Sequence, residues 1–364
     1  MNEIIYQYWF LQNEDIPFTR KARLIDYFFD SYHIFNASEK ELIASGLMKK
    51  KEAEQFVANR AKFDLDREYE SFTQTPYSFI TMESSVYPEK LRNIYEVPYG
   101  LFYIGKLPSF ERCVSIVGAR RCSAYGKRMS LDLGEALGAA GYTVISGMAR
   151  GVDAYGHQGC LNADGSTVAV LGCGCDVVYP AENRLLYEEI AKKGAVISEY
   201  QIGSSPKAQN FPLRNRIVSA LSDVVIVVEA REKSGSLITA DYALEQGKDI
   251  YVVPGRVGDS LSEGCNKLIT QGAGVIWKVD QFISELGEIY GQPTVIPENN
   301  KPEKSKLSKE LNRIYNLFDL YPKSLATVLE ETQMDYLQLL SSVLTLESMG
   351  MLHEAFKNNY VKQV

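Results

Sequence analysis

The spacing of apolar and polar positions divides the chain into three stretches of different character. In residues 1–70, apolar residues recur at helical spacing between turn signals, which predicts a small helical domain. The stretch that follows is rich in Tyr and Pro and predicts short strands at FITM (79–82) and GLFYIG (100–105). Nothing in the first 70 residues indicates catalysis, so we expect a packing or interaction module there.

From Cys113 to about Trp277, short apolar runs alternate with helical segments. Near-continuous Val and Ile runs between helices predict a parallel sheet covered on both faces, because a half-exposed antiparallel sheet would alternate apolar and polar positions. We therefore expect a doubly wound, Rossmann-like α/β domain over 71–286, including an N-terminal extension. Such folds bind ligands at the carboxyl ends of their strands. The predicted strands are CVSIVG, YTVIS, STVAVLG, AVISEY, DVVIVVEA and DIYVVPG.

The last part of the chain begins with a stretch rich in Pro, Asn and charge, which predicts a linker over 287–306. Three amphipathic segments and a closing hairpin over 307–364 then have the outline of a winged helix. Residues 301–364 carry eight Lys and Arg against eight Asp and Glu. This balance leaves open whether the unit contacts DNA or a protein.

Composition limits the class of protein. Hydrophobic residues make up 45% of 364 residues, enough for two or three folded domains. There is no apolar stretch of about 18 residues and no signal-peptide pattern at the start, so we expect a cytoplasmic protein without a membrane span. Six cysteines without CxxC spacing predict reduced thiols. We expect no zinc site and no cofactor.

The net charge of −7 would by itself weigh against nucleic acid as a ligand. Its distribution changes that interpretation. Residues 112–131 contain no Asp or Glu but carry Arg112, Arg120, Arg121, Lys127 and Arg128. Residues 200–222 are again free of acids and carry Lys207, Arg214 and Arg216. We call these two stretches the basic islands.

The first island contains a turn, VGARRCSAYGK (117–127), between a predicted strand and a predicted helix. Gly118 would let the backbone approach an anion, and the helix N-terminus would offer free N–H groups near Ser123. Arg120, Arg121 and Lys127 would contact phosphate oxygens. The turn matches neither a Walker A loop nor GxGxxG, which disfavours a nucleoside triphosphatase or a dehydrogenase.

Three further segments fall where such a sheet places its ligand. SGMARGVDA (146–154) brings Gly147, for which anion approach and tight packing are both open. Asp153 and His157 lie four residues apart on one predicted helix and so face each other. Because the chain has no nucleophile elbow, we expect a structural hydrogen bond there rather than a catalytic pair. FPLRNR adds Arg214, Asn215 and Arg216. SGSLITA adds Ser234, Gly235 and Ser236, which predict an anion seat at a helix cap.

Together these segments resemble the DNA-processing protein A family (DprA/Smf). The resemblance covers about residues 77–277 and rests on VGARRCSAYG, SGMARGVDAYGHQGCL, AVLGCGCDVVYPAEN, FPLRNRIVSALSDVVIVVEA, SGSLITADYALEQGKDIYVVPG and SEGCNKLITQGA. The first helical domain resembles the family's SAM-like domain, and the C-terminal unit resembles its winged-helix domain.

The resemblance implies a protein of natural transformation that binds single-stranded DNA and has no catalysis of its own. It also implies a homodimer formed through the Rossmann-like domain. RecA recombinase, loaded onto the DNA, and single-stranded-DNA-binding protein are the implied partners. Arg120 matches a DNA-contacting arginine of the family, Gly118 and Ser123 match the same loop, and Arg214, Asn215 and Arg216 match a segment bordering its positive pocket.

An enzymatic alternative remains. The SGSLITA turn is also similar to nucleotide-hydrolysing relatives of the lysine-decarboxylase-like group, which act on nucleoside monophosphates. Those proteins use PGGxGT followed by a glutamate, and SGSLITADYALE lacks that signature.

Overall fold

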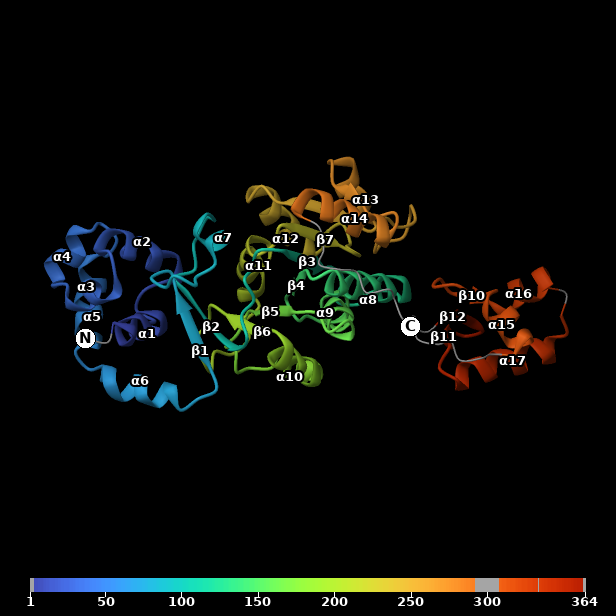
Figure 1. The fold of residues 1–364 in the computed structure, drawn as a ribbon, viewed down its shortest axis with the longest axis horizontal. Helices are drawn as coiled ribbons and strands as arrows, with labels where there is room; N and C mark the ends of the chain where they lie inside the picture. Colours follow the sequence, from blue (N-terminus) through green and yellow to red (C-terminus); the bar gives the residue numbers. More distant parts are fainter. Residues whose placement is uncertain (1–2, 292–307, 333, 363–364) are drawn as a thin grey trace.

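The computed structural model describes residues 3–291, 308–332 and 334–362, and its centre is a nine-stranded sheet (Figure 1). The strand order is β1-β2-β6-β5-β4-β3-β7-β8-β9. The strands are β1 (Ser78–Thr81), β2 (Gly100–Gly105), β3 (Cys113–Val117), β4 (Thr143–Ser146), β5 (Thr167–Leu171), β6 (Ala195–Ser198), β7 (Val224–Val227), β8 (Asp249–Val252) and β9 (Gly274–Val275).

Strands β3 to β9 pair in parallel, whereas β1 and β2 add an antiparallel edge. The parallel part of the sheet starts in the middle at β3, proceeds to β6 on one side, then crosses to β7 on the other. The order therefore reverses between β3 and β7, which are direct neighbours. This switch point is where a doubly wound sheet opens a crevice for a ligand. The predicted Rossmann-like fold is confirmed, including the short strands at 79–82 and 100–105.

Helices cover both faces of the sheet because alternate strand residues point to opposite sides. Val114 and Ile116 pack with α8, α9 and α14, while Cys113 and Val117 pack with α7, α11, α12 and α13. The helices of this domain are α7 (Glu89–Arg92), α8 (Ala124–Ala139), α9 (Val152–Asn162), α10 (Arg184–Lys193), α11 (Asn210–Ala220), α12 (Gly235–Glu245), α13 (Glu263–Thr270) and α14 (Val279–Tyr290), with a 3₁₀ turn at Ala181–Asn183.

The N-terminal unit is helical, as predicted, and consists of six helices. They are α1 (Ile4–Gln12), α2 (Phe18–Phe28), α3 (Ser31–Asn36), α4 (Glu39–Ala44), α5 (Lys50–Arg60) and α6 (Leu65–Thr73). Its core is aromatic and continues into the antiparallel edge of the sheet. Phe10 meets Tyr99 edge to face at 4.8 Å, and Phe72 lies 6.0 Å from Phe102 of β2. The unit is thus packed onto the sheet.

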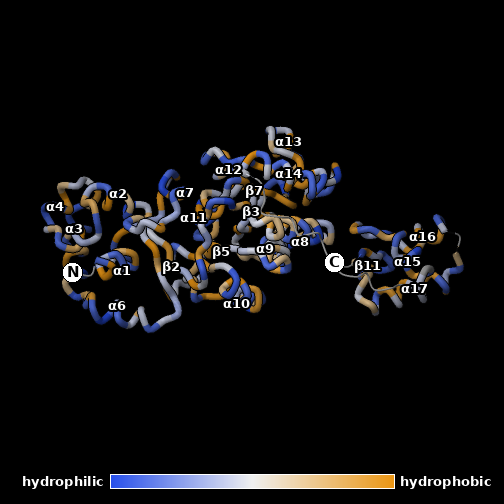
Figure 2. Tube along the Cα trace, viewed as in Figure 1, coloured by the Kyte–Doolittle hydropathy of each residue, from blue (hydrophilic) through white to orange (hydrophobic). Residues whose placement is uncertain are grey.

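The C-terminal unit is a small three-helix domain with a three-stranded sheet, in agreement with the predicted winged-helix-like fold. Its elements are α15 (Lys309–Tyr315), β10 (Lys323–Ser324), α16 (Leu325–Thr332), α17 (Tyr336–Ser348), β11 (Leu352–Phe356) and β12 (Asn359–Lys362). Hydrophobic and hydrophilic residues alternate along the helices at both ends of the chain (Figure 2).

The predicted linker 287–306 overlaps α14, which continues to Tyr290, and its residues 292–306 lie outside the described ranges. Among the described residues, no helix is both long enough and apolar enough to cross a membrane.

Candidate nucleic-acid interface

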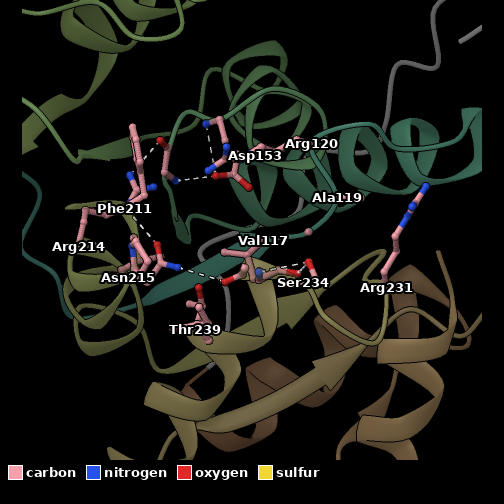
Figure 3. Close-up of a pocket in the computed structure, with 18 of the residues that line it drawn as sticks. Val117, Ala119, Arg120, Asp153, Phe211, Arg214, Asn215, Arg231, Ser234 and Thr239 are labelled. Atoms are coloured by element: carbon pink, nitrogen blue, oxygen red, sulfur yellow. Dashed lines mark hydrogen bonds between the residues drawn. The ribbon is translucent and has the colours of Figure 1, made fainter. Parts of the chain in front are cut away.

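An open pocket lies at the carboxyl ends of β3, β4 and β7, at the switch point of the sheet. Its volume is about 660 Å³, and its wall combines the turns after these strands with α11 and the start of α12. Figure 3 shows Arg120 and Asp153 facing Arg214, Asn215 and Ser234 across it. Of the twelve residues predicted for the site, nine line this pocket: Gly118, Arg120, Arg121, Gly147, Arg214, Asn215, Ser234, Gly235 and Ser236.

The turn after β3 places two arginines at the mouth of the pocket. Arg120 and Arg121 are both exposed, and the Arg120 guanidinium carbon lies 5.6 Å from the centre of the Phe211 ring. Gly118 is close-packed, because an added Cβ would lie 2.8 Å from Val152 and 3.0 Å from the backbone oxygen of Glu229. The backbone therefore runs where a larger residue would not fit, and the arginine side chains remain free to reach a ligand.

Ser123 has a different role from the one predicted. Its hydroxyl accepts from Gly126 N–H at 3.1 Å, which caps α8. Its own N–H and hydroxyl donate to the Glu229 carboxylate at 2.9 and 2.5 Å. The N-terminus of α8 is thus occupied by an internal carboxylate, and Ser123 is outside the pocket lining. The Glu229 carboxylate therefore takes the place of the phosphate predicted at this helix end, which corrects the role predicted for Ser123.

Lys127 also lies outside the pocket lining. It is partly buried on α8, and its ammonium nitrogen lies 5.3 Å from the centre of the Tyr155 ring on α9. The cation–π contact directs the charge toward the neighbouring helix. Lys127 therefore contributes to the packing of α8 on α9 and to the general field of the region.

The turn after β4 is held by a buried carboxylate. Asp153 accepts from the backbone N–H groups of Gly147 and Ala149 at 3.2 and 3.4 Å. Burial raises the pKa of Asp153, while Arg214 and the two N–H groups act in the opposite direction. Asp153 and His157 make separate structural bonds rather than the single one predicted: His157 Nδ1 lies 2.6 Å from Thr167 Oγ1, in the interior.

Arg214 of α11 is buried, with 5% of its surface exposed, although it lines the pocket. Its guanidinium donates to the carbonyl oxygens of Gly147, at 2.9 Å, and of Val170. A Cβ at Gly147 would lie 2.6 Å from the guanidinium carbon of Arg214, so this glycine makes room for the side chain. Arg214 therefore joins the turn after β4 to strand β5 and positions the pocket wall.

Arg216 is on the same helix but faces away from the pocket, which corrects its prediction as a phosphate contact. It is 1% exposed and donates two hydrogen bonds of 2.8 Å to the Glu199 carboxylate. Its Nε donates to the Glu96 carbonyl oxygen at 3.1 Å, and its guanidinium lies over the Phe18 ring. A charge held in this way cannot turn toward a ligand, and Arg216 instead connects α11, the end of β6 and the N-terminal unit.

The opposite wall is the N-terminus of α12, the helix end for which the sequence predicts an anion seat. Ser234 caps the helix, although the bond from Ser236 N–H to its hydroxyl is long, at 3.4 Å. Gly235 is exposed, and a Cβ there would meet no atom within 4 Å. This end combines the positive pole of a helix with the exposed backbone of Gly235, an arrangement that favours a bound anion.

The pocket residues that the sequence analysis missed include two cations, Arg231 and Lys233, and two aromatic residues, Tyr179 and Phe211. The two cations are exposed. The Tyr179 and Phe211 rings lie 5.4 Å apart at an interplanar angle of 31°. Among the described residues that line the pocket, five are cationic and one is acidic. Since Asp153 and Arg214 are both buried, the exposed charge comes from Arg120, Arg121, Arg231 and Lys233.

The fold is that of a Rossmann-like protein with a cationic and aromatic cleft at the switch point of its sheet. The sequence profile of the DNA recombination-mediator protein A family matches residues 78–287. This range includes all nine strands of the large sheet and every residue that lines the pocket. The chain belongs to this family.

Curated relatives and solved structures agree. The chain is 40% identical to Protein Smf of Synechocystis over 241 residues, which are 65% of this chain and 61% of that protein. The X-ray structure of DNA processing protein A from Streptococcus pneumoniae matches with a TM-score of 0.66 and 29% identity, over 77% of this chain and 97% of that one. A Helicobacter pylori structure described by its single-stranded DNA binding mode matches with a TM-score of 0.54 and 32% identity, over 59% and 97%.

Proposed function

We propose that the pocket binds a short stretch of single-stranded DNA, and that the protein serves DNA processing in transformation without catalysis of its own. The observation that carries the proposal is the combination of four exposed cations, an open helix N-terminus and a pair of aromatic rings in one cleft. Cations and backbone N–H groups suit phosphates, while aromatic faces suit bases of any sequence. The name of the Helicobacter pylori relative supports the same ligand.

Arg120 and Phe211 give this proposal its detail. Arg120 lies over the outer wall of the cleft, next to the ring of Phe211, so a phosphate bound by the guanidinium would leave the adjoining base near the ring. Because the contacts are to phosphates and to ring faces, we expect weak sequence preference. Carboxylates are scarce, and the only one in the described lining, Asp153, is bound to two backbone N–H groups, which disfavours the nucleotide-hydrolase alternative.

Fluorescence anisotropy of a labelled oligothymidine across salt concentrations tests the proposal. If the four exposed cations each neutralise one phosphate, log Kd should change with log salt by about 0.7 per contact, or about 2.8 in all. Arg120→Ala should weaken binding at least about tenfold and reduce that slope by about 0.7. Arg128→Ala is the matched control, because Arg128 is an exposed arginine of the same basic island, pairs with Asp132 at 2.7 Å and lies outside the pocket. Equal effects of the two substitutions would contradict the pocket assignment.

We further propose, from the family resemblance, that the protein forms a homodimer, acts in the cytoplasm and hands its DNA to RecA recombinase in the presence of single-stranded-DNA-binding protein. An exposed leucine on α12, Leu244, offers apolar surface for a second copy. Light scattering of the purified chain tests the dimer. A strand-exchange assay with RecA and single-stranded-DNA-binding protein tests the transfer, and no acceleration by this protein would contradict it.

A further inference from the structure

The C-terminal unit contacts the Rossmann-like domain through the ring of Tyr321, which lies in the loop between α15 and β10. The Tyr321 ring stacks on the Tyr125 ring, with centres 5.9 Å apart and an interplanar angle of 21°. The Arg256 guanidinium carbon lies 3.5 Å from the centre of the Tyr321 ring. We call this three-residue arrangement the tyrosine latch. Figure 1 shows the C-terminal unit next to α8, the helix whose first turn carries Tyr125.

Both elements that hold Tyr321 continue into the wall of the pocket. Tyr125 lies four residues after Arg121 in the sequence, and Arg256 lies five residues before Leu261. Arg121 and Leu261 both line the pocket. The two elements are also joined to each other, because the Tyr125 hydroxyl donates to the Pro254 carbonyl oxygen at 3.3 Å. The latch therefore sits beside the pocket, where a strand longer than the pocket would continue.

The chemistry around Tyr321 is that of a nucleobase site. Proteins stack unpaired bases on aromatic rings and on arginine guanidinium groups. The Tyr321 ring contacts one of each, the Tyr125 ring and the Arg256 guanidinium. Arg256 is exposed apart from this contact and would bind a phosphate as readily as a ring. Tyr321 thus occupies a place that a base of single-stranded DNA would fill with the same interactions.

We propose that Tyr321 is an internal competitor of the DNA: a strand bound in the pocket and extending past it stacks on Tyr125 and Arg256, displaces Tyr321 and releases the C-terminal unit. This inference rests on the proposed function. A strand that reaches both sites gains the second contact at high effective concentration.

The test compares two lengths of labelled oligothymidine on the full chain, about 5 and about 20 nucleotides. Tyr321→Ala should strengthen binding of the longer strand about three- to tenfold, since it removes a stacking pair and a cation–π contact that compete with the DNA. Binding of the shorter strand, confined to the pocket, should stay within about twofold. Tyr336→Ala, at a half-exposed tyrosine of the same unit, is the matched control and should change neither.

Hydrogen exchange gives the second readout. Adding the longer strand to the wild type should increase exchange in residues 319–323, although ligand binding usually slows exchange, and Tyr321→Ala should show the faster exchange without DNA. Unchanged or weaker binding of the longer strand by Tyr321→Ala, or slower exchange in 319–323 with DNA, would overturn the competition while leaving the pocket proposal intact. Absence of binding by both proteins would overturn both proposals.

Discussion

Arg216→Met should destabilise the protein strongly and leave the DNA pocket intact at low temperature. Arg216 is 1% exposed, and its partner Glu199 has 5% of its side chain exposed. Removing the cation leaves a buried carboxylate without its two 2.8 Å hydrogen bonds and also removes the bond to the Glu96 carbonyl. Loss of one partner of a buried ion pair costs about 3–5 kcal/mol. For a domain of this size that lowers Tm by roughly 10 °C.

Thermal unfolding and oligothymidine binding, measured on the same preparations, separate the two roles that an arginine of this segment can have. The double variant Arg216→Met, Glu199→Gln should recover most of the stability, since the unpaired charge is removed together with its partner. Arg120→Ala is the opposite case, with weak binding and near-normal Tm. A Tm of Arg216→Met within about 2 °C of the wild type, combined with tenfold weaker DNA binding, would refute the structural assignment of Arg216.

Two further substitutions, each with a control, test buried positions of the Rossmann-like domain. Gly147→Ala places a Cβ 2.6 Å from the Arg214 guanidinium carbon, so it should lower the free energy of unfolding in urea by about 2–3 kcal/mol by breaking the hydrogen bonds of Arg214. Gly235→Ala is the control, because the added Cβ meets no atom within 4 Å and stability should stay nearly unchanged. Equal losses in the two variants would contradict the packing argument. His157→Gln tests a buried neutral histidine, for which burial lowers the pKa to about 3. The unfolded chain takes up this proton first, near pH 6.5, so stability falls as the pH falls from there toward 3, by about 2 kcal/mol between pH 7 and 5. The variant should lose that part of the pH dependence, whereas the exposed His33→Gln should retain it.

The tautomer of His157 follows from its neighbours and explains why the charged form is disfavoured. The Thr167 hydroxyl donates to the Val144 carbonyl oxygen at 2.7 Å, so its oxygen accepts the proton of His157 Nδ1. Nε2 then carries the lone pair and has no hydrogen-bond partner among the described residues. A second proton would sit on this buried nitrogen without an acceptor, in the field of Arg214.

The sheet was predictable from sequence because its signals are local. Each predicted strand is a short apolar run followed by a turn, and each agrees with a strand of the structure; β3 and β7 are examples in which every residue is buried. The position of the pocket followed from the parallel order alone, since carboxyl ends of neighbouring strands meet at one edge. Nine of the twelve predicted residues therefore line it.

The three remaining residues were not predictable because each has a partner outside its own basic island, brought to it by the fold. Ser123 bonds to Glu229, 106 positions away, and Arg216 pairs with Glu199, which lies just outside the acid-free island. An island defined by the absence of nearby acids says nothing about acids brought in by the fold. The search for acid-free stretches also missed Arg231 and Lys233, because Glu232 lies between them in the sequence. In the structure, Arg231 and Lys233 line the pocket and Glu232 does not.

The buried arginines of this region have a structural role and the exposed arginines are available to a ligand, because the two kinds differ in the cost of desolvation. Arg214 and Arg216 have exchanged water for fixed acceptors, and a phosphate would have to break those bonds before it gained any. Arg120 and Arg121 have kept their water, which a phosphate replaces with little reorganisation of the protein. The buried pair therefore supports the structure around the pocket, and the exposed pair supplies the attraction that a DNA strand can use. A count of arginines along the sequence overestimates the number that contact DNA, because it does not separate buried from exposed side chains.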